Sequence, residues 1–312
     1  MALTGPEVAF QQLAFRAKWA GVFGGLVWGT FWVPVRLLDE AGVTGLWAVA
    51  LLYGLGALCS LPLLAWRWRR VLAGGWRLQL TGVILGLAIA LYGAAFLYTD
   101  VASAVLLFYL SPVWGFLLGR IVLRDPVTPV RWLAMVLALG GAAIVLGGSS
   151  WPPLPSNPGD WLALASGLLY VIGSLMMLTW RSVPASDYTL SFLVWAGVAM
   201  LLLAPLLEGS QLNLEAVVAE FPWLLAFVLL VLLPGCYAAV FGASVLNPGV
   251  VGILYMTEIG VSLLLAALIT DEVFGWREGI GIGLIALAGA LEGLIGLWRL
   301  AKERRRVTLD RA

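Results

Sequence analysis

The 312-residue sequence contains no histidine and only two cysteines, Cys59 and Cys236. Histidine is the commonest metal ligand and the usual side-chain proton switch near neutral pH, so its absence argues against many metal and catalytic sites. Both cysteines lie in apolar runs, where free thiols are ordinary, and we predict no disulfide, zinc site or thiol chemistry. The sequence also lacks a Gly-x-Ser-x-Gly elbow and a Walker-type phosphate loop. We therefore expect neither an enzyme nor a bound cofactor.

Charged residues are scarce as well. They make up 11% of the sequence, whereas 62% of the residues are hydrophobic and the mean hydropathy is +1.00. This composition lies well outside the usual range for soluble domains and indicates an all-α integral membrane protein with no nucleic-acid partner. A helix that crosses the bilayer needs ~20 apolar residues. By this criterion we predict ten spans, at 18–37, 45–66, 77–98, 101–122, 130–148, 160–180, 188–207, 221–241, 249–270 and 278–298.

The distribution of basic residues predicts how these spans are oriented. If the amino terminus is cytoplasmic, only Arg36 and Arg277 of the 18 lysines and arginines lie towards the outside. Positive charge is normally retained on the cytoplasmic side of a membrane protein. We therefore predict a multi-pass protein of the cytoplasmic membrane with both termini in the cytoplasm. The first apolar run continues into a full span, so we expect no cleaved signal peptide.

The two halves of the sequence align with each other at an offset of 147 residues. Residues 108–128 match residues 255–275 without a gap, and this alignment pairs Ser111 with Glu258. Each half has five predicted spans, an odd number, so the second half must be inserted upside down. Inverted repeats are typical of secondary transporters, whose substrate site lies near the membrane midplane at the repeat interface. The predicted units are a first five-helix repeat (1–148), an extracytoplasmic linker (149–159), a second inverted five-helix repeat (160–298) and a basic cytoplasmic tail (299–312).

The ends of the aligned segments carry two related motifs. The first half reads Leu110-Ser-Pro112…Val-Leu-Arg-Asp125-Pro-Val-Thr128, and the second reads Met256-Thr-Glu258-Ile259…Ile-Thr-Asp-Glu272-Val-Phe-Gly275. In both position and spacing they resemble the EamA-type permeases of the drug/metabolite transporter superfamily. The resemblance covers nearly the whole length and implies ten helices around a central cavity that opens alternately to each side. The motif acids Asp125 and Glu272 are expected to be structural and to cap the helix that follows each turn.

Glu258 is the main candidate for a functional side chain. It lies near the middle of the apolar run 250–270, and a carboxylate inside a membrane span normally faces water or a partner. Tyr255 and Ser262 lie three residues before it and four after it, so the spacing predicts that all three share one helical face. Two interpretations stay open. Glu258 binds the substrate or a coupling proton, or it is a protonated acid that is hydrogen-bonded inside the bundle.

The resemblance further implies that helices 1, 3, 4, 6, 8 and 9 line the cavity. One carboxylate among aromatic rings suits an organic cation, through charge pairing and cation–π attraction. The alternative is that the aromatic side chains simply fill the bundle. The predicted substrate-binding residues are Trp28, Trp32, Tyr92, Phe96, Phe108, Ser111, Trp114, Tyr255, Glu258 and Ser262.

Three functions are compatible with these observations. The first is secondary active transport of a small polar metabolite, such as an amine, a quaternary ammonium or an amino-acid-like compound, by alternating access and with proton coupling through Glu258. The second is facilitated diffusion of a neutral solute such as a sugar or nucleobase. The third is a non-transporting membrane enzyme or a lipid-handling scaffold, against which the inverted repeat argues. The expected partners are a small-molecule substrate, the lipid bilayer and, for the first function, a proton.

Overall fold

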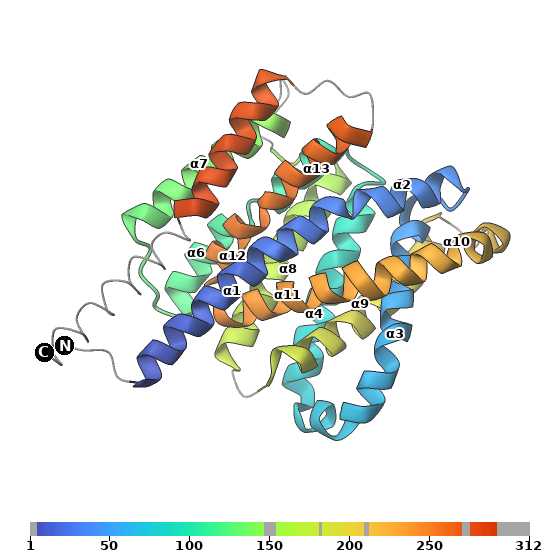
Figure 1. Ribbon diagram of the computed structural model, residues 1–312, viewed down its shortest axis with the longest axis horizontal. Coiled ribbons are helices and arrows are strands. Elements are labelled where there is room, and N and C mark those ends of the chain that lie inside the picture. Colours follow the sequence, from blue (N-terminus) through green and yellow to red (C-terminus); the bar gives the residue numbers. More distant parts are fainter. Residues whose placement is uncertain (1–4, 147–153, 181–182, 209–211, 270–274, 292–312) are drawn as a thin grey trace, which may run out of the picture.

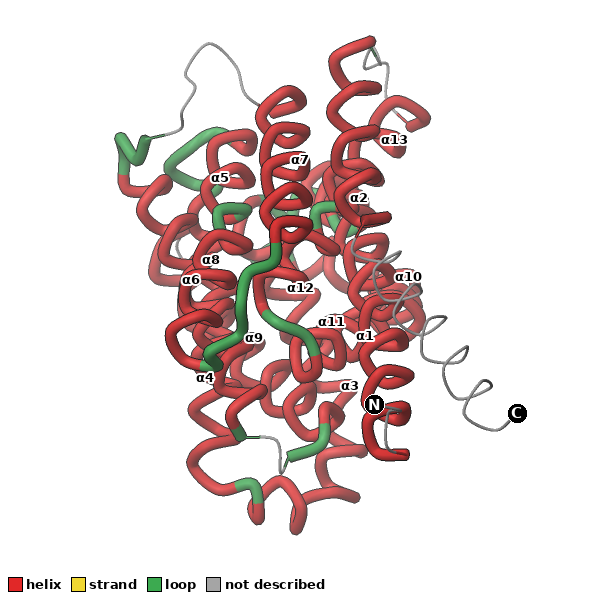
Figure 2. Tube along the Cα trace, turned by 90° about the vertical axis from the view of Figure 1, so that its left-hand side faces the viewer, coloured by secondary structure: helices red, strands yellow, loops and turns green. Residues whose placement is uncertain are grey.

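The computed structural model describes residues 5–146, 154–180, 183–208, 212–269 and 275–291. Within these ranges the chain is helical and contains no strand. Figure 2 shows the helices joined mostly by short loops. The helices are α1 (Gly5–Thr30), α2 (Trp32–Glu40), α3 (Gly45–Ala73), α4 (Gly75–Ala95), α5 (Val101–Phe108), α6 (Ser111–Val122), α7 (Pro129–Leu146), α8 (Pro158–Thr179), α9 (Ala185–Glu208), α10 (Leu214–Phe227), α11 (Leu233–Val245), α12 (Pro248–Tyr255) and α13 (Thr257–Ile269). A π-helical turn, Val228–Leu232, joins α10 to α11, and residues 276–291 are also helical.

The described ranges contain nine segments that are long and apolar enough to cross a membrane. They coincide with the first nine predicted spans, and the protein is a multi-pass membrane protein. The tenth predicted span, 278–298, begins within the helix at 276–291 and then leaves the described residues. Residues 149–153 of the linker 149–159 and the whole tail 299–312 also lie outside them. Large apolar side chains such as Leu58, Leu206 and Leu230 are exposed on the bundle, as expected for a surface that faces lipid.

Contacts between helices that are distant in the sequence form the bundle. Helix α3 packs on α9, and α4 packs on both α8 and α9. Helix α1 lies along α11, α12 and α13. In Figure 1, α1 is the long blue helix beside these orange helices. Helix α6 contacts α12, so segments from the two halves of the chain meet directly.

Two of the spans are interrupted at positions related by the 147-residue offset. Helix α5 ends at Phe108 and α12 ends at Tyr255, which are paired by the offset. The residues that cap their amino termini, Asp100 and Asn247, are also paired, and each side chain accepts a backbone N–H. In the fourth span, Pro112 lacks an N–H and its ring would clash with the carbonyl of Phe108, so the helix ends there. The predicted alignment of residues 108–128 with 255–275 therefore agrees with the observed helix ends.

Glycine allows the two interrupted spans to approach closely. A Cβ atom at Gly115 of α6 would lie 2.3 Å from the Gly249 nitrogen of α12, and one at Gly252 would lie 2.8 Å from the Pro112 ring. In the absence of a hydrophobic force between helices, small residues let membrane helices pack through their backbones. The contact brings the carboxyl half of one broken span against the amino half of the other.

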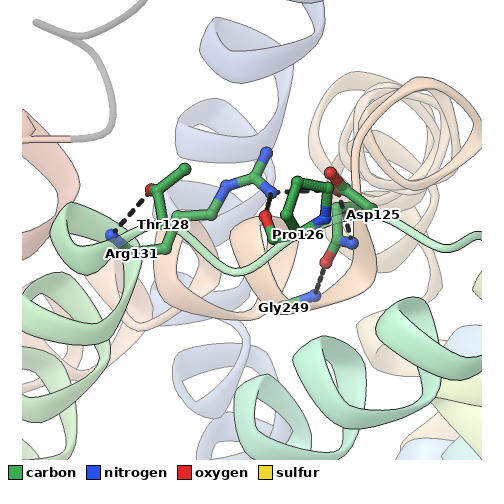
Figure 3. Close-up of polar contacts among 6 residues, drawn as sticks. Asp125, Pro126, Thr128, Arg131 and Gly249 are labelled. Carbon is green, nitrogen blue, oxygen red and sulfur yellow. Dashed lines mark hydrogen bonds and ion pairs between the residues drawn. The ribbon is translucent and has the colours of Figure 1, made fainter.

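Asp125 joins the two halves at one end of this contact (Figure 3). Its Oδ2 accepts hydrogen bonds from the Arg131 guanidinium (2.9 Å) and from the Asn247 side chain (3.0 Å). Asn247 in turn accepts from the Gly249 N–H at the start of α12. The side chain that accepts a backbone N–H at the start of α7 is Thr128, which binds Arg131. Asp125 thus has the expected structural role, but it connects side chains rather than capping the next helix. Glu272 lies outside the described residues.

Candidate substrate-binding site

The ninth span breaks immediately before Glu258. Met256 separates α12 from α13, and Glu258 lies in the first turn of α13. At the break, the Ile259 N–H donates to the Met256 carbonyl (3.1 Å) rather than to the Tyr255 carbonyl one residue earlier. The Thr257 hydroxyl donates a hydrogen bond to the Leu254 carbonyl oxygen (2.8 Å). The structure therefore places Tyr255 on a different helix from Glu258 and Ser262, whereas the sequence predicted one continuous face.

Tyr109 connects the two broken spans. Its hydroxyl group donates to Glu258 Oε2 at 2.5 Å and also lies 3.1 Å from the Tyr255 carbonyl oxygen. Tyr109 follows the last residue of α5, so it occupies the break in the fourth span as Met256 occupies the break in the ninth. It was not among the predicted site residues, because its counterpart at the 147-residue offset is the apolar Met256. The available signal was the adjacent Phe108, which was predicted to line the site. Where a helix ends at such a residue, the next side chain, here Tyr109, changes direction.

The surroundings of Glu258 are aromatic. The carboxylate lies deep in the bundle yet retains partial exposure. In the described part of the chain it interacts electrostatically with four tyrosines and with no lysine or arginine. These tyrosines are Tyr53 of α3, Tyr92 of α4, Tyr109 of the fourth span and Tyr255 of α12. Its position at the amino end of α13 favours a negative charge by about 0.3–1 kcal/mol, because the helix dipole is positive there.

A chain of ring contacts extends from α4 across the fourth and sixth spans to α12. The ring centroids of Tyr92 and Phe108 are 4.6 Å apart, and those of Tyr170 and Tyr255 are 5.9 Å apart. Phe108 links these pairs through Tyr170 at 6.1 Å, and Phe96 continues the chain beyond Tyr92 at 4.9 Å. The structure therefore brings Tyr92, Phe96, Phe108 and Tyr255 together. Tyr170 of α8 was not predicted.

Trp28 belongs to a second aromatic group. Its ring lies 5.4 Å from Phe31 and stacks on Tyr53 at 6.3 Å. Tyr53 is buried on α3, and its ring also contacts Phe192 of α9 at 6.2 Å. Because Tyr53 interacts with Glu258, this group connects α1 and α3 to the carboxylate. The second span was not among the helices expected to line the site, so Tyr53 was missed.

The remaining predicted residues lie apart from the ring chain. The chain turns at Phe31, so Trp28 ends up on α1 and Trp32 at the start of α2, rather than on one helix. Ser262 donates its hydroxyl to the Gly29 carbonyl at 3.1 Å and thereby fastens α13 to α1. Ser111 is buried at the start of α6. Trp114 lies on the same helix, one turn further along.

Several buried polar groups of the aromatic side chains lack a hydrogen-bond partner. Among the described residues, Trp32 Nε1, Trp114 Nε1 and the Tyr53 hydroxyl have no hydrogen-bond partner. The hydroxyls of Tyr170 and Tyr255 approach each other without reaching hydrogen-bond geometry. Unsatisfied buried polar groups are uncommon in native structures and are often explained by water, an ion or a ligand. One carboxylate, several free aromatic hydroxyls and stacked rings together can bind a cationic or aromatic small molecule. The described residues contain no group of three or more acids or cysteines placed to hold a metal ion.

Comparisons with known proteins agree with this architecture. One solved structure, titled "Crystal structure of protein", superposes with a TM-score of 0.71 at 20% sequence identity and covers 90% of this chain and 97% of that chain. At this identity the likeness shows the fold alone. No curated protein matches the sequence. The model of the EamA-like transporter family matches residues 16–147, which span the first half. This match confirms the resemblance noted in the sequence: residues 16–147 of this membrane protein match the model of the EamA-like transporter family.

Proposed function

We propose that the protein is a secondary transporter that exchanges a small organic cation for a proton at Glu258. The observation that carries the proposal is the position of this carboxylate. It lies at the break of the ninth span and is held by Tyr109 from the break of the fourth span. Broken membrane helices are characteristic of transporter binding sites, because their ends supply charge and free backbone groups near the midplane. The substrate class is an amine, a quaternary ammonium or an amino-acid-like compound.

The surroundings of Glu258 support a cationic substrate. Glu258 has no basic partner among the described residues, and a buried carboxylate in such surroundings favours either a proton or a cation. The rings of Tyr92, Phe108 and Tyr170 can stabilise a cation by about 0.5–2 kcal/mol each. A single carboxylate that holds one positive charge at a time gives exchange, since the proton must leave before the substrate is bound.

The arrangement of the helices supports alternating access between two inverted five-helix repeats, 1–148 and 160–298. The helix ends and the capping residues Asp100 and Asn247 are related by the same 147-residue offset, and α6 of the first half contacts α12 of the second. In this proposal the fourth and ninth spans cross at the repeat interface. The extracytoplasmic linker, both cytoplasmic termini and residence in the cytoplasmic membrane are parts of the same proposal and follow from the distribution of basic residues.

The experiment is a thermal-stability screen of the purified protein against amines, quaternary ammonium compounds, amino acids, sugars, nucleobases and organic anions. A ligand that binds only the folded state at 100 times its Kd adds about 2.7 kcal/mol of stability. We expect amines or quaternary ammonium compounds to raise the melting temperature of the wild type. Glu258→Gln should lose this response, because it keeps the shape of the side chain but not the charge.

The matched control is Glu215→Gln, the same substitution at an exposed position on α10. It should respond to ligand as the wild type does. A shift produced only by sugars or nucleobases, and retained by Glu258→Gln, would instead indicate a facilitative carrier of neutral solutes. A cation response retained by Glu258→Gln would contradict the assigned role of the carboxylate.

A further inference from the structure

The Tyr109 hydroxyl has one hydrogen but faces two acceptors. Glu258 Oε2 lies at 2.5 Å and the Tyr255 carbonyl oxygen at 3.1 Å. A phenolic group can donate to only one of them at a time, while its oxygen can also accept. The direction in which the hydrogen points therefore depends on whether Glu258 carries a proton of its own.

The Tyr255 carbonyl belongs to the break between α12 and α13. The Ile259 N–H, which would bind this oxygen in a continuous helix, donates to Met256 instead. Carbonyls at helix ends need a side chain, water or a ligand as donor. In the described part of the chain, Tyr109 is the donor that reaches this oxygen.

We propose that Tyr109 is a positioning residue that transmits the protonation state of Glu258 to the α12–α13 break. When Glu258 is protonated, its O–H donates to Tyr109 Oη, Tyr109 donates to the Tyr255 carbonyl, and both bonds are made. When the proton leaves to water, Tyr109 turns its hydrogen to the carboxylate and the Tyr255 carbonyl loses its donor. The break is then held less firmly until a cation replaces the proton. This inference deepens the proposed function and rests on it.

The described groups around Tyr109 and Glu258 are neutral, so they do not contribute a second charge to the exchange of the proton. Among the described residues the titratable neighbours are Tyr53 on α3, Tyr92 on α4, Tyr170 on α8 and Tyr255 on α12, and Cys236 of α11 acts on Tyr53 and Tyr255. Helix α1 presents glycines to α13: Gly25 faces Thr257, and Gly29 faces the Glu258 backbone. All the neutral partners stay neutral over the pH range in which a carboxyl group titrates, so Glu258 alone changes charge.

The test is amide hydrogen exchange of the ligand-free protein at residues 255–259, measured across pH and corrected for the intrinsic exchange rate. In the wild type, exchange should become about five-fold faster as pH rises, since one hydrogen bond is lost at the break. Tyr109→Phe removes the hydroxyl and should exchange fast at every pH. Glu258→Gln keeps a donor for Tyr109 and should exchange slowly at every pH. Tyr237→Phe, the same change on the exposed face of α11, should behave as the wild type.

The two variants move in opposite directions, which a general loss of stability cannot produce. The inference is overturned if Tyr109→Phe retains the pH dependence of the wild type or if Glu258→Gln exchanges fast. Should Tyr109→Phe fail to fold, the comparison of wild type with Glu258→Gln decides alone, because the wild type must be pH-dependent and the variant must not. Loss of cation binding in the stability screen, with the pH-dependent exchange intact, would overturn the proposed substrate and leave the role of Tyr109 standing.

Discussion

At the residue scale, a buried ion pair fastens α3 to α9. The Nε and Nη2 atoms of Arg67 each lie 2.7 Å from Asp187 Oδ1, and the Asp187 side chain is only 2% exposed. By contrast, Arg36 and Glu40 form a pair of which more than half of each side chain is exposed. Water screens the second pair but not the first, so the two should differ strongly in their contribution to stability.

We predict that Asp187→Asn lowers the free energy of unfolding by about 3 kcal/mol, because it leaves the Arg67 charge without its partner. The control Glu40→Gln should change it by no more than about 0.5 kcal/mol. Denaturant unfolding in detergent measures both values. Equal effects of the two substitutions would show that the Arg67–Asp187 pair is solvated in the protein.

Asp100 gives α5 a pH-sensitive cap outside the membrane spans. It caps α5, and hydrogen bonds from the Ser103 hydroxyl and N–H hold the pKa of its carboxyl below the ordinary value. A lowered pKa means that the ionised form stabilises the fold at neutral pH, and that this stabilisation disappears as the pH falls through the pKa.

Asp100→Ala should therefore reduce stability by about 1 kcal/mol at pH 7 and by progressively less as the medium becomes more acidic than about pH 4. Thermal unfolding at several pH values follows this difference. Asp39→Ala, on the exposed end of α2, should change stability by less than about 0.5 kcal/mol throughout. If Asp100→Ala instead reduced stability more at low pH than at pH 7, the ionised carboxylate of Asp100 would not be the stabilising form.

At the element scale, the contact of α6 with α12 depends on the absence of a side chain at Gly115. A Cβ there would overlap the backbone of Pro248 and Gly249, which cannot move without displacing the start of α12. Gly140 of α7 is a suitable comparison, because no described atom outside the backbone of its own helix lies within 4 Å of a Cβ at that position.

We expect Gly115→Ala to destabilise the protein by about 2–3 kcal/mol through overpacking, and Gly140→Ala to stabilise it by up to about 1 kcal/mol through helix propensity. Thermal unfolding of the two variants in the same detergent provides the comparison. Similar melting temperatures would mean that the two broken spans do not pack as closely as described.

The elements also show how far the sequence predicts the fold. Hydropathy located nine spans because each contains enough apolar residues to cross the bilayer. It could not locate the break at Met256, since the run 250–270 contains no proline and the Tyr109 hydroxyl that binds the Tyr255 carbonyl there is distant in sequence. The break at Phe108 was readable from Pro112. Glu258 was identified because a lone acid in an apolar run is costly, whereas Tyr53 and Tyr170 resemble the aromatic residues of any bundle core.

At the scale of the whole molecule, the two ends of α3 face opposite sides of the membrane. Glu208, the last residue of α9, accepts hydrogen bonds from the N–H groups of Leu46 and Trp47 at the start of α3. Asn213, which caps α10, lies beside Gly42 near the same end. Arg69 lies near the other end of α3. The distribution of basic residues predicts that the Arg69 end is cytoplasmic.

In a variant without Cys59 and Cys236, we predict that a membrane-impermeant maleimide labels Glu215→Cys in intact cells and Arg69→Cys only after lysis. Labelling of both from the same side would contradict the arrangement of the spans. Labelling in the reverse order would keep the fold but invert the proposed orientation.

The central claim is that Glu258 exchanges a proton for an organic cation, and proton movement in proteoliposomes tests it most directly. A quaternary ammonium compound identified in the stability screen is added outside vesicles that contain a pH-sensitive dye. Such a compound has no neutral form that could cross the bilayer and change the internal pH by itself. The account predicts that the lumen becomes alkaline with the wild type and Glu215→Gln, and that it stays unchanged with Glu258→Gln. Alkalinisation that persists in Glu258→Gln would show that the proton is carried elsewhere and would contradict the account.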